Sequence, residues 1–447
     1  LHIRRTVEAI EILENVTFVD HVQFANTTLN NAGRAMRQFQ SDVVNKDQEV
    51  QVSFGYGTSA NQIQMLKGNL LHQQDFTGNG KIIAVMDAGF PNVNTAQPFQ
   101  RLRDNNKILG GYDFVNRNTN FYTGGTHGTL VLSTIGGYVE NQLVGTGPDA
   151  SYYLFITEDV SDENPVEESY WVEAAEMADS LGVDIINTSL GYFLYNNPNY
   201  SYNYSNMNGT TAFISRGADI AFSKGMICVV SAGNSGAGAN PNITAPADAI
   251  NALAVGAVAP DSSYASFSSI GPSSDGRVKP DIMAQGQQAD VSDTFGNIVT
   301  ANGTSFSSPI ISGMVACLWQ AFPNKTNVEI MQMIKQSAHL YATPNNQFGY
   351  GIPDFGKAMS DALDVPVFSK NELSVYPNPA NSVVNLNIPE SYGEVQIFIY
   401  NQLGQEIVNR EIKKENPVLS VENLQSGIYL YKIKAGNTYK AGKLAIK

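Results

Sequence analysis

From about residue 78 onward, short apolar runs of strand length alternate with stretches of helical periodicity, and this alternation constrains the fold more than any other feature. Residues 81–86 (Lys-Ile-Ile-Ala-Val-Met) form a continuous apolar run, which is typical of a parallel strand buried on both faces. Residues 152–156 and 183–186 are further strand-like runs, and residues 171–181 between them have helical spacing. The pattern predicts an α/β fold, a parallel sheet with helices on both faces.

Polar residues stand at the ends of these predicted elements, where a ligand could reach them. The run 81–86 ends at Asp87, and the carboxyl ends of parallel strands border the ligand crevice. His127 lies at the start of a predicted helix in a glycine-rich setting (Gly-Gly-Thr-His-Gly-Thr). The other histidines, all in settings that suit catalysis less, are His2, His21, His72 and His339. His127 is therefore the candidate general base.

Ser305 is a candidate nucleophile because it stands where a loop becomes a helix. It lies in residues 303–309 (Gly-Thr-Ser-Phe-Ser-Ser-Pro), which enter an apolar run that reaches about residue 322. The unpaired N–H groups and the dipole of a helix N-terminus stabilise negative charge that develops nearby. Serine or threonine at this position is more often a plain N-cap. The nucleophile interpretation gains weight from the base and the acid elsewhere in the chain.

Four segments in order resemble the subtilisin-like serine proteases, the subtilase family. They are Asp-Ala-Gly after a strand, His-Gly-Thr at a helix start, residues 228–236 (Cys-Val-Val-Ser-Ala-Gly-Asn-Ser-Gly), and Gly-Thr-Ser-x-x-x-Pro before a long helix. The order Asp, His, Ser along the chain is also that of the family. The resemblance covers about residues 76–363. It implies a serine endopeptidase that cleaves peptide bonds through an acyl-enzyme, with the triad Asp87, His127 and Ser305, and with Asn234 in the oxyanion hole.

The resemblance also implies where an extended peptide substrate would bind. Residues 187–191 (Asn-Thr-Ser-Leu-Gly) resemble the family segment that forms one wall of the pocket for the residue before the cleaved bond. Residues 232–234 would form the opposite wall, and free backbone groups would pair with the peptide by strand addition. The residues expected to contact the substrate in these walls are Ser189, Leu190, Gly191, Ala232 and Gly233.

Two positions depart from the family pattern. Ala88 follows the candidate acid where the family often has Ser or Thr, and Phe306-Ser307 stands where a Met-Ala pair is common. We expect both departures to preserve activity, although Phe306 could change how the loop seats against the substrate.

Residues 157–168 contain six acidic side chains and no basic one. A solvated loop that leads into a helix N-terminus would explain about half of them. In the resembled family this loop borders the outer substrate subsites. A second hypothesis is therefore that Glu158, Asp159 and Asp162 favour basic residues a few positions upstream of the cleaved bond. The loop could instead bind calcium, but its spacing is not that of a recognised calcium-binding loop.

The composition narrows the choice of partners and cofactors. A net charge of −14 in a chain of 447 residues argues against nucleic acid or an anionic membrane surface as the partner. No apolar run reaches the roughly 18 to 20 residues that cross a bilayer, so no transmembrane segment is expected. The resemblance implies no cofactor for catalysis, with structural calcium possible but its ligands unassigned. Cys228 and Cys317 are expected to be small buried residues rather than a disulfide.

The leading segment resembles the end of a subtilase propeptide. Residues 4–14 have helical spacing and residues 16–24 are strand-like, so residues 1–24 are interpreted as the propeptide end. Residues 25–75 would be a linker and the lead into the mature enzyme. Because the first residue is Leu rather than Met, the chain is expected to be a processed or truncated product.

The last 81 residues differ in charge from the remainder of the chain. Residues 367–447 carry 9 basic and 7 acidic side chains, whereas the remainder carries 18 basic and 34 acidic. Short alternating runs between Gly, Pro and Asn predict a small antiparallel β-sandwich. An accessory or carbohydrate-binding module would fit this pattern. Residues 374–380, 400–405 and 442–447, however, resemble the type A sorting domain of the type IX secretion system. That resemblance implies export across the outer membrane of a Gram-negative bacterium, to the medium or the cell surface.

Three other functions remain open at this point. The chain could be a binding protein that has kept a subtilase-like fold without turnover, although all triad residues and the oxyanion donor are present. It could be a latent zymogen in which residues 1–24 block the cleft. A serine hydrolase of another kind is favoured less, because the sequence lacks a Gly-x-Ser-x-Gly elbow.

Overall fold

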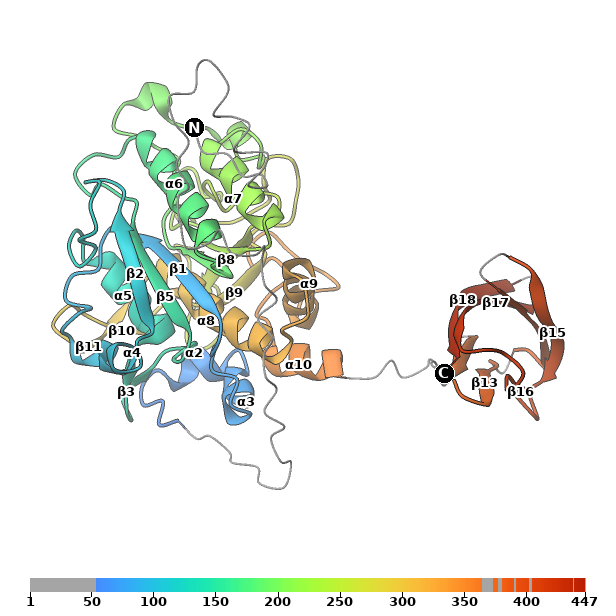
Figure 1. Ribbon diagram of the computed structural model, residues 1–447. Coiled ribbons are helices and arrows are strands. Elements are labelled where there is room, and N and C mark those ends of the chain that lie inside the picture. Colours follow the sequence, from blue (N-terminus) through green and yellow to red (C-terminus); the bar gives the residue numbers. More distant parts are fainter. Residues whose placement is uncertain are drawn as a thin grey trace, which may run out of the picture. The chain divides into compact units, whose positions relative to one another are not determined.

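The computed structural model describes residues 54–363 and, with gaps at 377–379, 390, 402–403 and 437, residues 373–446. The interpretation of residues 1–24 as a propeptide end lies outside the described residues, as does that of residues 25–53. The chain divides into two compact units, Leu1–Asp361 and Ala362–Lys447, drawn in Figure 1.

The first unit is built on a seven-stranded sheet in the order β2-β5-β1-β6-β7-β8-β9, and every pair of neighbours in it is parallel. The three strand-like runs of the sequence form β1, β5 and β6 at the centre of this sheet. The predicted parallel α/β fold is thus confirmed. The strands are β1 (Ile82–Asp87), β2 (Ile108–Asp113), β5 (Ser151–Ile156), β6 (Ile185–Thr188), β7 (Ile227–Ser231), β8 (Leu253–Val258) and β9 (Ile282–Gln285).

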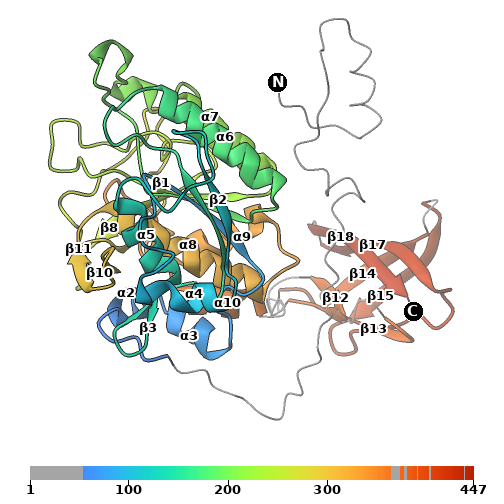
Figure 2. The ribbon, with the colours of Figure 1, turned by 60° about the vertical axis from the view of Figure 1, so that its left-hand side comes forward.

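Helices cover both faces of the sheet because the side chains of each buried strand alternate between two cores (Figures 1 and 2). In β1, Ile83 and Val85 pack with helices α5 (His127–Gly136) and α8 (Thr304–Ala321). Ala84 and Met86 point to the other face and pack with helices α6 (Val166–Ser180) and α7 (Phe213–Ser223). This two-sided burial explains why the strand reads as a continuous apolar run rather than an alternating one.

Helix α8 runs through the middle of the first unit. Of its 18 residues, 15 are buried, and it packs against α5 and the strands β6 to β9. It carries Pro309 inside the helix, and Cys317, which like Cys228 is a buried free thiol. A helix held on all sides in this way gives its first turn a fixed place.

Smaller elements complete the first unit. The short helices are α2 (Ala60–Gln64), α3 (Gly68–Gln73), η2 (Gln97–Phe99), α4 (Gln100–Asp104), η3 (Pro198–Tyr200), η4 (Tyr204–Asn206), α9 (Asn327–Ser337) and α10 (Phe355–Leu363). Two antiparallel pairs of strands are β3 (Tyr138–Val139) with β4 (Leu143–Val144) and β10 (Ala289–Ser292) with β11 (Ile298–Ala301).

The second unit has two antiparallel sheets, in the orders β12-β13-β16 and β15-β14-β17-β18. Side chains of both sheets share one apolar cluster, in which Val384 and Leu386 meet Ile397 and Ile433. This arrangement is the predicted β-sandwich. Its strands are β12 (Ser374–Tyr376), β13 (Val383–Asn387), β14 (Glu394–Tyr400), β15 (Glu406–Lys413), β16 (Val418–Ser420), β17 (Gly427–Ala435) and β18 (Thr438–Ile446). Within the described residues of both units, no helix is long and apolar enough to cross a membrane.

Candidate active site

The candidate residues come from distant parts of the sequence and meet where the strands end and two helices begin. Asp87 is the last residue of β1, and Ser189 directly follows β6. His127 is the first residue of α5, and Ser305 is the second residue of α8. Because these parallel strands all end at the same edge of the sheet, their polar residues gather there.

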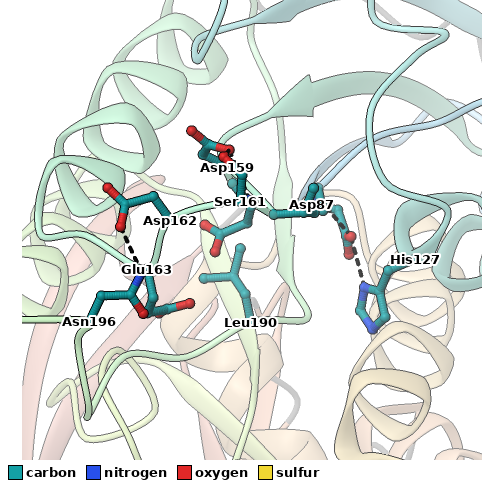
Figure 3. Close-up of a pocket in the computed structure, with 11 residues that line it drawn as sticks. Asp87, His127, Asp159, Ser161, Asp162, Glu163, Leu190 and Asn196 are labelled. Atoms are coloured by element: carbon teal, nitrogen blue, oxygen red, sulfur yellow. Dashed lines mark hydrogen bonds and ion pairs between the residues drawn. The ribbon is translucent and has the colours of Figure 1, made fainter.

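Asp87 orients His127 through a hydrogen bond. The His127 Nδ1 atom lies 2.8 Å from the Asp87 Oδ1 atom, a contact that Figure 3 shows. A carboxylate only accepts hydrogen bonds, so Nδ1 carries the proton and Nε2 is left as a proton acceptor. The negative charge of Asp87 raises the pKa of His127 above its ordinary value of 6.5, against the opposing effect of partial burial.

The close approach of α5 to the end of β1 depends on glycine. A Cβ atom on Gly128 would lie only 2.5 Å from the carbonyl oxygen of Gly89 and 3.0 Å from the Asp87 Cβ atom. Any larger residue at position 128 would push the helix away from the strand. The glycine next to His127 therefore allows the imidazole to reach Asp87.

The second oxygen of Asp87 has an unusual environment. The backbone N–H of Ala88 donates to Asp87 Oδ1 at 2.7 Å, but Asp87 Oδ2 is buried and has no hydrogen-bond partner among the described residues. Ala88 stands at a position where subtilases often have Ser or Thr. Alanine offers no side-chain donor to this oxygen.

Ser305 is held by Ser189 from the neighbouring strand end. The Ser189 hydroxyl donates to the Ser305 carbonyl oxygen at 2.9 Å, and the Ser305 hydroxyl donates to the Ser189 carbonyl oxygen at 3.1 Å. Pro309 explains the first bond. It stands four residues after Ser305 and has no N–H group, so it cannot supply the usual helical hydrogen bond to the Ser305 carbonyl.

His127 contacts the residue after Ser305, and no hydrogen bond joins His127 to Ser305 within the part of the chain that the structure describes. Phe306, the residue after Ser305, packs its ring against that of His127 with the centroids 5.9 Å apart. Bonds between base and nucleophile are often long without substrate and tighten when it binds. The structure thus pairs Asp87 with His127 and places His127 against Phe306, the residue that follows the candidate nucleophile.

Thr304 fixes the orientation of the Asn234 side chain. The Asn234 Oδ1 atom accepts from the Thr304 backbone N–H at 2.9 Å and from the Thr304 hydroxyl at 3.0 Å. A backbone N–H can only donate, so the atom facing it must be the amide oxygen. The Asn234 Nδ2 group therefore remains available to another acceptor, beside Gly303 and the loop that leads to Ser305.

A cleft of about 680 Å³ lies between the two predicted walls. Ser189, Leu190 and Gly191 line one side, and Gly233 and Asn234 line the other, with Ser305 between them. Ala232 does not line the cleft. It is fully buried, its N–H donates to the Val255 carbonyl and its carbonyl accepts from Thr244, so it supports the wall from behind.

Thr244 is a cleft residue that the sequence did not reveal. Its Oγ1 atom is buried and has no hydrogen-bond partner among the described residues. A Cβ atom on Gly191 would lie 2.3 Å from this oxygen, and one on Gly233 would lie 3.2 Å from it. Thr244 thus sits between the two walls. No sequence motif identifies Thr244 as a cleft residue, because a loop from a distant part of the chain brings it to the cleft.

The acidic segment 157–168 divides into structural carboxylates and carboxylates that line a cavity. Glu167 accepts from the backbone N–H groups of Asp159 and Asn164, and burial raises its pKa to about 7. Glu168 accepts from the hydroxyls of Tyr195 and Tyr202 and from the N–H of Ile214. Glu167 thus holds the acidic loop to the start of α6, and Glu168 joins α6 to α7 and to the segment that carries the two tyrosines. Among the described residues, no group of three or more His, Cys, Asp or Glu side chains is placed to hold a metal ion, and the expectation of structural calcium stays a prediction.

Comparisons with known proteins agree with this geometry. Residues 78–351 match the model of the subtilase family, and residues 374–447 match that of a secretion system C-terminal sorting domain. Subtilisin NAT of Bacillus subtilis subsp. natto is 30% identical over 293 residues, which are 65% of this chain and 68% of that protein. Subtilisin Savinase of Lederbergia lenta is 29% identical over 295 residues, 65% of this chain and 94% of that protein.

Solved structures share the fold. The crystal structure of MycP1 from the ESX-1 type VII secretion system superposes with a TM-score of 0.53 at 22% identity, over 67% of this chain and 85% of that one. The structure of MycP3 from the type VII (ESX-3) secretion system gives a TM-score of 0.54 at 19% identity, over 69% and 89% of the two chains. At such identities the likeness supports the fold alone.

Proposed function

Because this chain belongs to the subtilase family of serine endopeptidases, which hydrolyse proteins, we propose that Asp87, His127 and Ser305 are its catalytic triad. The observation that carries the proposal is the hydrogen bond between Asp87 and His127. Helix α8 has the candidate nucleophile in its first turn. The Asp-His pair leaves one imidazole nitrogen free to accept a proton. Ser305 directly precedes Phe306, whose ring packs against that imidazole.

The proposed reaction begins when an extended peptide pairs with residues 189–191. The Ser305 hydroxyl leaves the Ser189 carbonyl, gives its proton to His127 Nε2 and attacks the peptide carbonyl carbon. His127 then gives the proton to the leaving amine, and an acyl-enzyme remains on Ser305. A water molecule attacks this ester with His127 again as the base, which releases the acid product and restores Ser305.

The negative oxygen of each tetrahedral intermediate would be held by two donors. One is the Asn234 Nδ2 group, which Thr304 turns toward the cleft by holding the amide oxygen. The other is the backbone N–H of Ser305, among the first N–H groups of α8, which have no helical partner. Loss of one such donor costs about 10²- to 10³-fold in turnover.

The second unit supports export of the enzyme. Residues 374–447 match a secretion system sorting domain, which implies that the chain is exported. We further propose that its partner is the type IX secretion machinery and that the chain crosses the outer membrane of a Gram-negative bacterium. In this proposal residues 1–24 are the end of a propeptide, so the protein begins as a zymogen.

Active-site labelling tests the proposed triad. A fluorophosphonate probe should label the purified chain on Ser305, and intact-mass analysis should show one probe per chain. Ser305→Ala should lose all labelling and slow peptide hydrolysis on the order of 10⁶-fold. The matched control is Ser223→Ala, an exposed serine near the end of α7, which should label normally. Equal labelling of Ser305→Ala and the parent chain would overturn the assignment.

A further inference from the structure

A second cavity opens on the other side of Leu190 from the main substrate cleft. It has a volume of about 330 Å³, and Asp87 and His127 line it at one end. Its other end is lined by Glu158, Asp159, Asp162 and Glu163. His127 is the one basic side chain among its lining residues. Figure 3 shows Leu190 between the acidic loop and the Asp87–His127 pair.

The carboxylates of Asp159 and Asp162 accept hydrogen bonds from nearby loop residues. Asp159 accepts from the backbone N–H and the hydroxyl of Ser161. Asp162 accepts from the side-chain amides of Asn196 at 2.7 Å and Asn164 at 3.1 Å. Such bonds shape an exposed loop and by themselves indicate no ligand.

The carboxyl groups of Glu158 and Glu163 have fewer hydrogen-bond donors beside them than those of the two aspartates. Glu158 accepts a hydrogen bond from the Tyr192 hydroxyl, and burial together with the charge of Glu167 raises its pKa well above the usual range. Glu163 is half-buried, and its side-chain carboxyl group has no hydrogen-bond partner in the described part of the chain. Burial raises its pKa as well. Carboxyl groups in this state are stabilised by a cation that enters beside them.

Asp87 adds an independent observation at the same cavity. Its side chain is 2% exposed, and its Oδ2 atom is the buried oxygen without a hydrogen-bond partner in the described residues. Asp87 on β1 therefore adds its negative charge beside the cavity, to the carboxyl groups of Glu158 on the loop after β5 and of Glu163 on the segment before α6.

The position of the cavity along a bound peptide follows from strand geometry. Leu190 and Glu163 line both this cavity and the main cleft. Successive side chains of an extended peptide point to opposite sides. When the side chain before the cleaved bond occupies the main cleft, the side chain one residue further upstream faces the cavity beside His127.

We propose that this cavity binds the Lys or Arg side chain of the second residue before the cleaved bond, so that the enzyme prefers substrates that are basic there. The aliphatic part of such a side chain would lie along Leu190 and its charged end would meet Glu158 and Glu163. The inference rests on the proposed function and specifies its substrate class.

Matched peptides test this preference on the purified full-length chain. The peptides are identical except at the second position before the cleaved bond, which holds arginine or citrulline, its neutral isostere. The parent enzyme should cleave the arginine peptide with a kcat/KM about tenfold or more above that for the citrulline peptide. Glu163→Gln and Glu158→Gln should each bring this ratio toward one. Glu163→Gln should fold normally, because the carboxyl group that it replaces is half-buried and unbonded in the described chain.

The control is Glu176→Gln, an exposed residue on α6 about 15 Å along the helix from its start, which should keep the parent ratio. An arginine-to-citrulline ratio near one in the parent enzyme would overturn the proposal. An arginine-to-citrulline ratio that stays at the parent value in both Glu163→Gln and Glu158→Gln would also overturn it. So would a preference for arginine that a chelator removes and calcium restores, because that result indicates a metal site. If neither peptide is cleaved and Ser305 takes no fluorophosphonate, the proposed catalytic function itself has failed.

Discussion

Ser189 and Ser305 are joined by two reciprocal hydrogen bonds, since the hydroxyl of each donates to the carbonyl oxygen of the other, at 2.9 and 3.1 Å. We predict that Ser189→Ala lowers the free energy of unfolding by about 1–3 kcal/mol, because it leaves the part-buried Ser305 carbonyl unpaired. It should also lower kcat, because the nucleophile loses a restraint. Denaturant unfolding and peptide hydrolysis measure the two effects. If Ser189→Ala kept the parent free energy of unfolding and the parent kcat, the hydrogen bonds between Ser189 and Ser305 would contribute to neither.

Thr304 should affect turnover through Asn234. Thr304→Val removes the hydroxyl that donates to Asn234 Oδ1 and accepts from the Gly233 N–H, so the amide can rotate away from the oxyanion. We expect kcat to fall by about tenfold, with KM little changed, because the lost interaction acts in the transition state. Thr304→Ser keeps the hydroxyl and should keep most of the activity. A larger loss in Thr304→Ser than in Thr304→Val would point to the methyl group instead, because valine keeps a methyl group and serine does not.

The pH profile should reflect the pair formed by Asp87 and His127. His127 acts as a base only when neutral, and Asp87 raises its pKa above 6.5, so kcat/KM should rise with pH through a midpoint above 6.5. Asp87→Asn should move this midpoint to lower pH and reduce turnover by about 10⁴-fold.

Stability should change in the opposite direction over the same pH range. A raised folded pKa means that protonated His127 stabilises the fold fully below about 6.5. That contribution is lost as pH rises through the folded pKa, while activity increases. Unfolding measured across this range in the parent chain and in His127→Ala should isolate the contribution. A parent chain whose stability gains with pH relative to His127→Ala would contradict the assigned shift.

A hydroxyl group next to Asp87 should stabilise the site. Ala88→Ser would supply a donor near the buried Asp87 Oδ2 atom, which has none in the described residues. We expect the free energy of unfolding to rise by about 1 kcal/mol. Thermal and denaturant unfolding measure the change, and Ala88→Val, which adds bulk without a donor, is the control. A rise in both variants would indicate better packing rather than a new hydrogen bond.

Removal of the second unit should leave catalysis unchanged. Each unit has its own apolar cores, so a chain ending at Leu363, the last residue of α10, should keep the kcat/KM and the thermal stability of the first unit. The same truncation should abolish export in a host that has the type IX machinery. Loss of peptide hydrolysis in the folded truncated chain would show that the second unit takes part in catalysis.

The sequence located the candidate triad because each residue has a local signature. Asp87 ends an apolar strand, His127 lies among glycines at a helix start, and Ser305 precedes a long apolar helix. The fold class followed from the same alternation of strands and helices. Such features depend on residues close together in the chain, which is why they can be read without coordinates.

Other site residues depend on contacts between distant segments and could not be read in this way. Thr244 reaches the cleft through a returning loop, and Ala232 turns out to be buried behind the wall. In the acidic loop the hypothesis named Glu158, Asp159 and Asp162. The structure shows that all of these residues and Glu163 line the cavity. Side-chain hydrogen bonds occupy both aspartates, whereas the Glu163 carboxyl group has no such bond in the described chain. Local composition identifies an acidic loop but not the direction of each carboxylate.

The burial of helix α8 separates two parts of the site that differ in how freely they can change. Ser305 lies in the first turn of a helix that has 15 of its 18 residues in the core, so nearly any substitution along this helix disturbs packing. Residues 160–162 of the acidic loop are exposed, with Val160 at 74%, so a new side chain there disturbs little packing. If the loop sets substrate preference as we propose, descendants of this chain can acquire new preferences through the loop while helix α8 is inherited intact.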